Sequence, residues 1–68
     1  MNEYLATVFG EDDSEFVGYF DSFERARQAI ESAIRVDRYW TSAEIYRPRT
    51  DTMWIYNSSE DTWNRVAN

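Results

Sequence analysis

Neither cysteine nor histidine occurs among the 68 residues of this chain. Disulfide bonds and the usual zinc sites are therefore excluded, and so short a chain folds only if it buries a sufficient apolar core. Three Trp, five Tyr and four Phe can supply that core, because each buried aromatic ring removes about 150–250 Å² from water. We expect a single domain over residues 1–68, of modest stability as a monomer unless it self-associates.

Thirteen acidic residues oppose seven arginines, which gives a net charge of −6. That charge disfavours direct binding of nucleic acid, whose affinity for proteins comes largely from neutralised phosphates. Every basic residue is Arg and none is Lys. A G+C-rich genome explains this choice, and so does a need for bidentate contacts to carboxylates at an interface.

The first residues, Met1–Tyr4, include no basic run followed by an apolar stretch, and no apolar segment approaches the length that crosses a bilayer. There is also no Cys to oxidise. We therefore expect a cytoplasmic protein that does not contact membranes.

Two short apolar segments near the start are typical of a β-hairpin. Residues 5–9 and 16–20 are rich in β-branched and aromatic side chains, as strands are. The polar residues 10–15 between them, which include one glycine, form the connecting turn.

The next segment has the periodicity of an amphipathic helix. Asp21 is the predicted N-cap, and Glu24 completes the spacing of a capping box. Asp37 would fall on the apolar stripe, so we expect the helix to end near Val36. Glu31 and Arg35 are spaced to form an ion pair across one turn. The apolar stripe, about 100° wide, consists of Phe23, Ala26, Ile30, Ala33 and Ile34.

Three further strands are predicted over residues 40–46, 53–56 and 62–66. Residues 47–51 form a loop, since they contain a proline that cannot donate to a strand ladder, and residues 57–61 form a turn-rich break. The order of elements is ββαβββ. The economical packing is an α+β fold in which the single helix covers one face of a small antiparallel sheet.

The residue types that common catalytic mechanisms need are missing. A serine nucleophile needs a base, and the chain has no His, Lys or Cys to act as base or thiol nucleophile. A pair of carboxylates can perform acid–base chemistry, but only in a cleft, for which so short a chain leaves little room. We therefore expect neither an enzyme nor a bound cofactor.

The densest charge feature is the acidic loop made by Glu11, Asp12, Asp13 and Glu15. It is too short for a calcium loop of the EF-hand type, and it lies between two strands where that motif needs two helices. We expect no metal site. The loop is either a solvated turn or a negatively charged tip that binds a basic surface.

Arg47 and Arg49 lie close to aromatic residues, a pattern that can clamp single-stranded nucleic acid. The negative net charge instead favours their pairing with Asp51 or with carboxylates of a partner.

The aromatic residues exceed what one helix and one sheet face can hide, and the other face of such a sheet is open to water. Either all of them pack inside, or some form an exposed cluster of the kind found at interface hot spots. The side chains that cannot all be assigned inward are Trp40, Trp54, Tyr56 and Trp63.

The layout resembles small phage and mobile-element proteins of ββαββ type, including some anti-CRISPR proteins that fold a single helix against a short antiparallel sheet. The similarity rests on Ser22-Phe23-Glu24-Arg25-Ala26 at the start of the helix, on Ile45-Tyr46-Arg47 and Trp54-Ile55-Tyr56 in successive strands, and on Trp63 near the end. It implies an inhibitor that binds a nucleoprotein machine in the host-cell cytoplasm, and it assigns no role to any single residue. The acidic charge then favours contact with a positively charged nucleic-acid channel.

Two hypotheses of function follow. In the first, this is an acidic protein-binding domain, a phage-type inhibitor or modulator that contacts a basic surface of a nucleic-acid-handling host protein. In the second, it is a small structural domain that forms a homodimer through its exposed aromatic sheet face, Trp54 and Tyr56 included. The predicted partner-binding residues are Glu11, Asp12, Asp13, Glu15, Asp21, Glu24, Trp54 and Tyr56.

Overall fold

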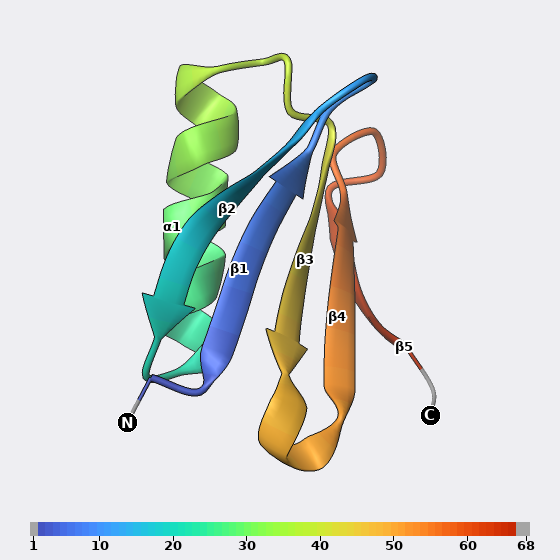
Figure 1. The fold of residues 1–68 in the computed structure, drawn as a ribbon. Coiled ribbons are helices and arrows are strands. Elements are labelled where there is room, and N and C mark those ends of the chain that lie inside the picture. Colours follow the sequence, from blue (N-terminus) through green and yellow to red (C-terminus); the bar gives the residue numbers. More distant parts are fainter. Residues whose placement is uncertain (1, 67–68) are drawn as a thin grey trace.

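The predicted strands form one antiparallel sheet, and the helix packs against one of its faces. The computed structural model describes residues 2–66. Its strands lie in the order β2-β1-β3-β4-β5, and the helix lies behind β1 and β2 in the view of Figure 1. The α+β class and the order of elements predicted from the sequence are confirmed. The elements are β1 (Tyr4–Phe9), β2 (Ser14–Phe20), α1 (Phe23–Val36), β3 (Ser42–Arg47), the 3₁₀ turn η1 (Pro48–Thr50), β4 (Thr52–Asn57) and β5 (Thr62–Val66).

Strand boundaries in the second half differ from the prediction: β3 extends to Arg47, and β4 runs from Thr52 to Asn57, where residues 40–46 and 53–56 were expected. The third strand was expected to begin at Trp40, but β3 begins at Ser42. Trp40 lies in the loop before it and packs against the core. The predicted loop around Pro48 contains a single 3₁₀ turn, which Asp51 ends in the left-handed conformation with φ 51°. Aspartate adopts this conformation more readily than most residues.

A β-bulge in β2 places two aromatic side chains on the same face of the sheet. Opposite β1, Val17 has no partner of its own, because the register shifts between Gly18 and Phe16. In a regular strand, side chains three residues apart point to opposite faces. The inserted residue brings Phe16 and Tyr19 to one side, where their ring centroids lie 5.0 Å apart in an edge-to-face arrangement.

The helix begins one residue later than the sequence pattern indicated, and Ser22 is its N-cap in place of Asp21. The Ser22 hydroxyl accepts a hydrogen bond of 3.1 Å from the backbone N–H of Arg25. Because the capping-box position lies three residues after the N-cap, it falls on Arg25, and the predicted role of Glu24 there is wrong. The helix ends at Val36, as predicted.

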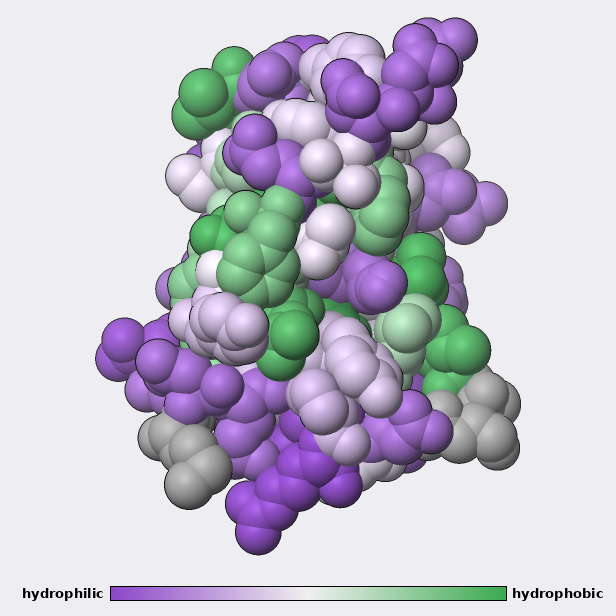
Figure 2. Space-filling view, viewed as in Figure 1, coloured by the Kyte–Doolittle hydropathy of each residue, from purple (hydrophilic) through white to green (hydrophobic). Residues whose placement is uncertain are grey.

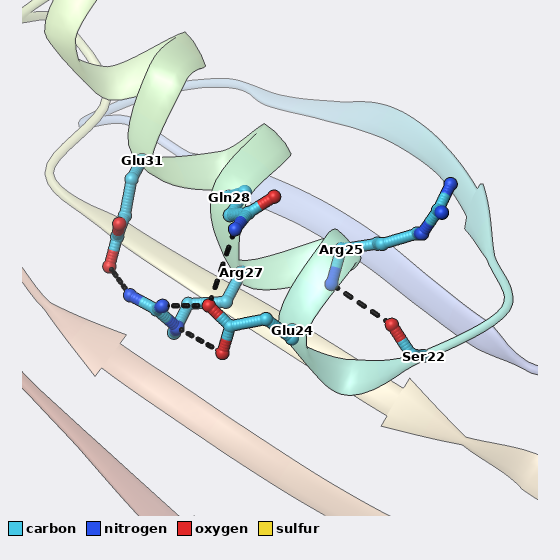
Figure 3. A network of polar contacts seen from close by, with 6 residues as sticks. All are labelled: Ser22, Glu24, Arg25, Arg27, Gln28 and Glu31. Atoms are coloured by element: carbon cyan, nitrogen blue, oxygen red, sulfur yellow. Dashed lines mark hydrogen bonds and ion pairs between the residues drawn. The ribbon is translucent and has the colours of Figure 1, made fainter.

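One flank of α1 carries acidic side chains that share a single arginine. Arg27 donates hydrogen bonds to Glu24 and, over 2.7 Å, to Glu31, as Figure 3 shows. Glu31 therefore pairs with the arginine one turn before it, and the predicted pair with Arg35 is wrong.

The core lies between the helix and the sheet and contains many small side chains, which let the two layers approach closely. Ile30 of α1 is fully buried against Val8 and Ile45 of the sheet. Because truncation of a buried isoleucine leaves a cavity, Ile30→Ala would cost about 2–5 kcal/mol. The buried apolar side chains are Ala6, Val8, Ala26, Ile30, Ala43, Ile45 and Tyr56.

Aromatic side chains extend this core toward β4 and β5. The ring centroid of Phe23 lies 4.9 Å from that of Trp54 and 5.6 Å from that of Trp63, and Trp63 lies 5.1 Å from Tyr56. Tyr56 is only 7% exposed, and Trp54 packs against the core. The prediction that Trp54 and Tyr56 belong to an exposed sheet face is therefore wrong, because the alternation of β4 turns both toward the helix side.

Candidate functional site

Three connections between elements meet at one end of the sheet, the upper end in Figure 1. Thr41 joins them through its backbone. Its N–H donates to the Phe9 carbonyl over 2.9 Å, and its carbonyl accepts from the Ser58 N–H over 3.0 Å. The three connections are the β1–β2 turn, the α1–β3 loop and the β4–β5 turn.

Tyr39 holds the β1–β2 turn in place. Its hydroxyl accepts a hydrogen bond of 3.0 Å from the backbone N–H of Asp12. Gly10 lies against the Tyr39 ring so closely that a Cβ at position 10 would overlap it. The turn that carries the acidic loop is therefore docked on the α1–β3 loop, and this docking requires the glycine.

Carboxylates at this end outnumber cations. Seven acidic residues lie in the three connections or at the adjoining start of β2, against Arg35 and Arg38. The net charge of this end is therefore −5, out of −6 for the whole chain, and the acidic and basic residues in the rest of the chain almost balance. We call this end the acidic end, and its carboxylates belong to Glu11, Asp12, Asp13, Glu15, Asp37, Glu60 and Asp61.

The ion pairs found among residues 2–66 all lie outside the acidic end. The most buried of them joins Glu3 to Arg47 over 3.1 Å and to Arg49 over 3.4 Å. The others follow α1 and are Asp21–Arg25, Glu24–Arg27 and Glu31–Arg27. Within the described residues, none of the seven carboxylates of the acidic end forms an ion pair with an arginine. Their negative charge exceeds the two positive charges of Arg35 and Arg38, so the potential at this end is negative.

Glu3 and its two arginines correct an expectation about the loop around Pro48. Burial alone would raise the pKa of the Glu3 carboxyl, but hydrogen bonds and charges from Arg47 and Arg49 outweigh it and lower that pKa. The predicted pairing of these arginines with Asp51 is wrong. Asp51 instead accepts a hydrogen bond of 2.8 Å from the Tyr46 hydroxyl, which raises the pKa of Tyr46.

The six predicted acidic residues divide between the two ends of the molecule. Glu11, Asp12, Asp13 and Glu15 are exposed and lie together at the acidic end. Asp21 and Glu24 follow the far end of β2, and each is paired with an arginine, so the six acidic residues predicted to bind a partner do not form one cluster.

The sequence reasoning missed the other members of the acidic end, which are Asp37, Glu60 and Asp61. The signal that could have found them is the order of elements. Because successive elements run in opposite directions, every second connection falls at the same end of the molecule.

The carboxylates of the acidic end are spread along its surface. Within residues 2–66, no three acidic side chains come close enough together to hold a metal ion. The chemistry that this end offers is a negative potential on a backbone held by hydrogen bonds.

An open groove of 340 Å³ lies between α1 and the β4–β5 turn. The Tyr56 hydroxyl donates to Asp61 over 2.7 Å, and this hydrogen bond, with burial, raises the pKa of Tyr56. Glu31, the other acid of the groove, is bound to Arg27. Both carboxylates are thus engaged in hydrogen bonds within the chain. The lining residues are Glu31, Ile34, Arg35, Arg38, Tyr56 and Asp61.

No element within residues 2–66 covers the face of the sheet opposite α1, which we call the open face. The strand register arranges its side chains in three rows. The upper row, next to the acidic end, is Ser14, Phe9, Ser42, Asn57 and Thr62. The middle row is Phe16, Thr7, Glu44, Ile55 and Asn64. The lower row is Tyr19, Leu5, Tyr46, Met53 and Val66.

The open face changes from polar to apolar away from the acidic end. Every side chain of the lower row is aliphatic, aromatic or a thioether. Figure 2 views this face, with green surface over its middle and purple surface both above and below it. Contiguous apolar surface of this kind marks interaction sites. The large apolar side chains exposed on it are Phe16 at 49%, Tyr19 at 59%, Ile55 at 38% and Val66 at 40%.

A hollow of 360 Å³ continues the apolar surface beyond the lower row. Leu5, Tyr19 and Pro48 form its apolar walls, and Glu3 and Arg49 also line it. The open face therefore ends at the Glu3 ion pairs, at the opposite end from the acidic carboxylates.

Comparison with known proteins adds no assignment to this geometry. No protein-family model, curated protein or solved structure matches the chain. The one α-helix of residues 2–66, α1, is too short and too polar to span a membrane. The acidic end and the open face are therefore the two surfaces from which a function can be inferred.

Proposed function

We propose that this chain is a protein-binding domain, a phage-type inhibitor or modulator whose acidic end contacts a basic surface of a nucleic-acid-handling host protein. The observation that carries the proposal is the segregation of charge. The acidic end holds five of the six net negative charges, while the ion pairs among residues 2–66 lie elsewhere.

The physical reason is electrostatic complementarity. Carboxylates that form no ion pair within their own chain speed the encounter with a basic surface and suppress binding to acidic ones. Proteins that handle nucleic acid carry such basic surfaces in order to neutralise phosphates. The hydrogen bonds of Thr41 and Tyr39 hold the backbone of the acidic end, which reduces the entropy lost on binding.

The test is affinity capture from a bacterial lysate, with the immobilised chain as bait and quantitative mass spectrometry as the readout. The variant Glu11→Gln/Asp12→Asn neutralises two carboxylates of the acidic end. The matched control Asp21→Asn/Glu24→Gln neutralises one Glu and one Asp at the other end, where arginines already pair with them. Both double variants change the net charge equally.

We expect wild type and control to enrich nucleic-acid-handling proteins at low salt. The acidic-end variant should enrich these proteins at least about threefold less than wild type, because it loses exposed ion pairs with the partner. High salt should weaken binding by all three proteins. Capture of no nucleic-acid-handling protein, or equal capture by the two double variants, would contradict the proposal.

Self-association is the second candidate, because the open face exposes Phe16, Tyr19, Ile55 and Val66. The homodimer predicted from the sequence would then use these side chains in place of Trp54 and Tyr56. Sedimentation velocity over a range of micromolar concentrations decides between a monomer and this dimer.

A further inference from the structure

Glu44 is the one charged side chain among the fifteen positions of the open face. It occupies the centre of the middle row, between Thr7 of β1 and Ile55 of β4. It is partly buried, and none of the ion pairs or side-chain hydrogen bonds within residues 2–66 involves it. Any molecule that covers the open face must therefore either pair with this carboxylate or strip it of water.

A second copy of this chain cannot supply the missing cation from the same face. Arg47 is engaged by Glu3 and lies 5.2 Å over the Tyr4 ring. Arg65 stands opposite Trp54, on the side of the sheet that faces the helix. In a two-fold stack of open faces, Glu44 would meet the other Glu44 or uncharged side chains, because the face carries no cation. A buried carboxylate without a charged partner is unfavourable.

The size of the open face also indicates a partner that reaches beyond it. The face is five strands wide and three residues deep, on the order of 500 Å² at strand spacing. Stable interfaces bury about 800 Å² on each side. A partner that continues from the open face onto the adjoining acidic end reaches that size, and the upper row, with Phe9 and Ser14, makes the two surfaces contiguous.

We infer that the open face binds an apolar surface of a partner protein centred on one Arg or Lys side chain, which pairs with Glu44. This inference rests on the proposed function, since it assigns a second contact to the same basic partner. The exposed aromatic pair Phe16 and Tyr19 provides the apolar contact. Glu44 selects a cation at the centre of that contact.

A pair of small probes tests this assignment without knowledge of the partner. Benzoyl-arginine amide carries a ring and a guanidinium, and benzoyl-citrulline amide is its uncharged near-isostere. Each is titrated into the isotope-labelled full chain and followed by amide chemical shifts. The titrations are repeated with Glu44→Gln and with Glu11→Gln/Asp12→Asn.

We expect the arginine probe to shift amides around Glu44, Thr7 and Ile55 and to bind about threefold more tightly than the citrulline probe, as an exposed charge pair predicts. Glu44→Gln should abolish that preference, and Glu11→Gln/Asp12→Asn should preserve it. Equal affinity of the two probes for the wild type, shifts confined to the acidic end, or a wild-type dimer in sedimentation would overturn the inference.

The two proposals fail separately. If the probes behave as expected while lysate capture is indifferent to Glu11→Gln/Asp12→Asn, the open-face contact stands and the role of the acidic end does not. If capture depends on the acidic end while the probes show no preference that depends on Glu44, the role of the acidic end stands and the open-face contact does not.

Discussion

At the scale of single residues, Glu3 connects the start of the chain to the loop after β3. Its side chain is 18% exposed and bonds to both Arg47 and Arg49, which are more than forty positions away in the sequence. Sequence reasoning placed these arginines in a loop but gave them the wrong partner, because Asp51 is near in sequence whereas Glu3 is near only after the sheet has formed.

Replacing Glu3 should change the dependence of stability on pH. Arginine contacts lower the pKa of Glu3 in the folded state. The ionised Glu3 side chain therefore stabilises the fold at pH values above its pKa in the unfolded chain, and this stabilisation is lost as pH falls through the folded-state pKa. We expect Glu3→Gln to unfold at lower urea concentration than wild type at neutral pH, with the difference shrinking below about pH 4. The control is Glu11→Gln, an exposed acid with no ion pair among residues 2–66. A difference between wild type and Glu3→Gln that stays constant across this pH range would contradict the assignment.

At the scale of elements, the start of α1 illustrates how two adjacent capping residues compete. Asp21 and Ser22 are both good N-caps, and the sequence pattern favoured Asp21 because Glu24 then completed a capping box. In the structure Ser22 accepts the hydrogen bond from the N–H of Arg25, and Asp21 forms an exposed pair with the side chain of Arg25.

Substitutions at these two positions should therefore have unequal effects. We expect Ser22→Ala to lower the free energy of unfolding by about 1 kcal/mol, whereas Asp21→Ala, which removes an exposed ion pair, should cost only a few tenths of that, about 0.3 kcal/mol. Urea denaturation measures both. The reverse ranking would place the cap at Asp21.

The bulge of β2 is the second feature at this scale, and Gly18 enables it with φ 156°. Residues with a Cβ rarely adopt this conformation, although there is space for the added methyl group. We expect Gly18→Ala to cost about 1 kcal/mol or more in urea denaturation and to weaken the contact between the rings of Phe16 and Tyr19. The helix substitution Ser32→Ala, at an exposed position, should be close to neutral. Equal stability of wild type and Gly18→Ala would show that the bulge does not depend on glycine.

At the scale of the whole molecule, much of the fold could be predicted from the sequence. Segments rich in β-branched and aromatic residues located the strands, and the fifth strand, Thr62–Val66, has the predicted bounds. The sequence could not predict which face of the sheet each side chain of the fourth strand occupies. Met53, Trp54, Ile55 and Tyr56 are all apolar, so no alternation between polar and apolar residues marks the buried face. Register with β3 decides that Met53 and Ile55 face outward. The acidic end likewise depends on topology that brings three separate turns together.

The charge of Glu44 should also limit self-association of the whole molecule. Glu44→Leu joins the apolar side chains on both sides of position 44 into one patch, and large exposed apolar patches favour association. We expect Glu44→Leu to form dimers or larger species at concentrations where wild type sediments as a monomer. Glu60→Leu makes the same charge change at the acidic end and should remain monomeric. Identical sedimentation of the two variants would contradict this role of Glu44.

The first strand begins and the last strand ends away from the acidic carboxylates, since the start of β1 and the end of β5 both lie toward the bottom of Figure 1. A fluorescent protein or an affinity tag fused through a linker to either terminus would therefore leave the acidic end facing solution. Immobilisation through such a tag also orients every molecule on a sensor chip the same way, with its carboxylates directed toward the flowing analyte.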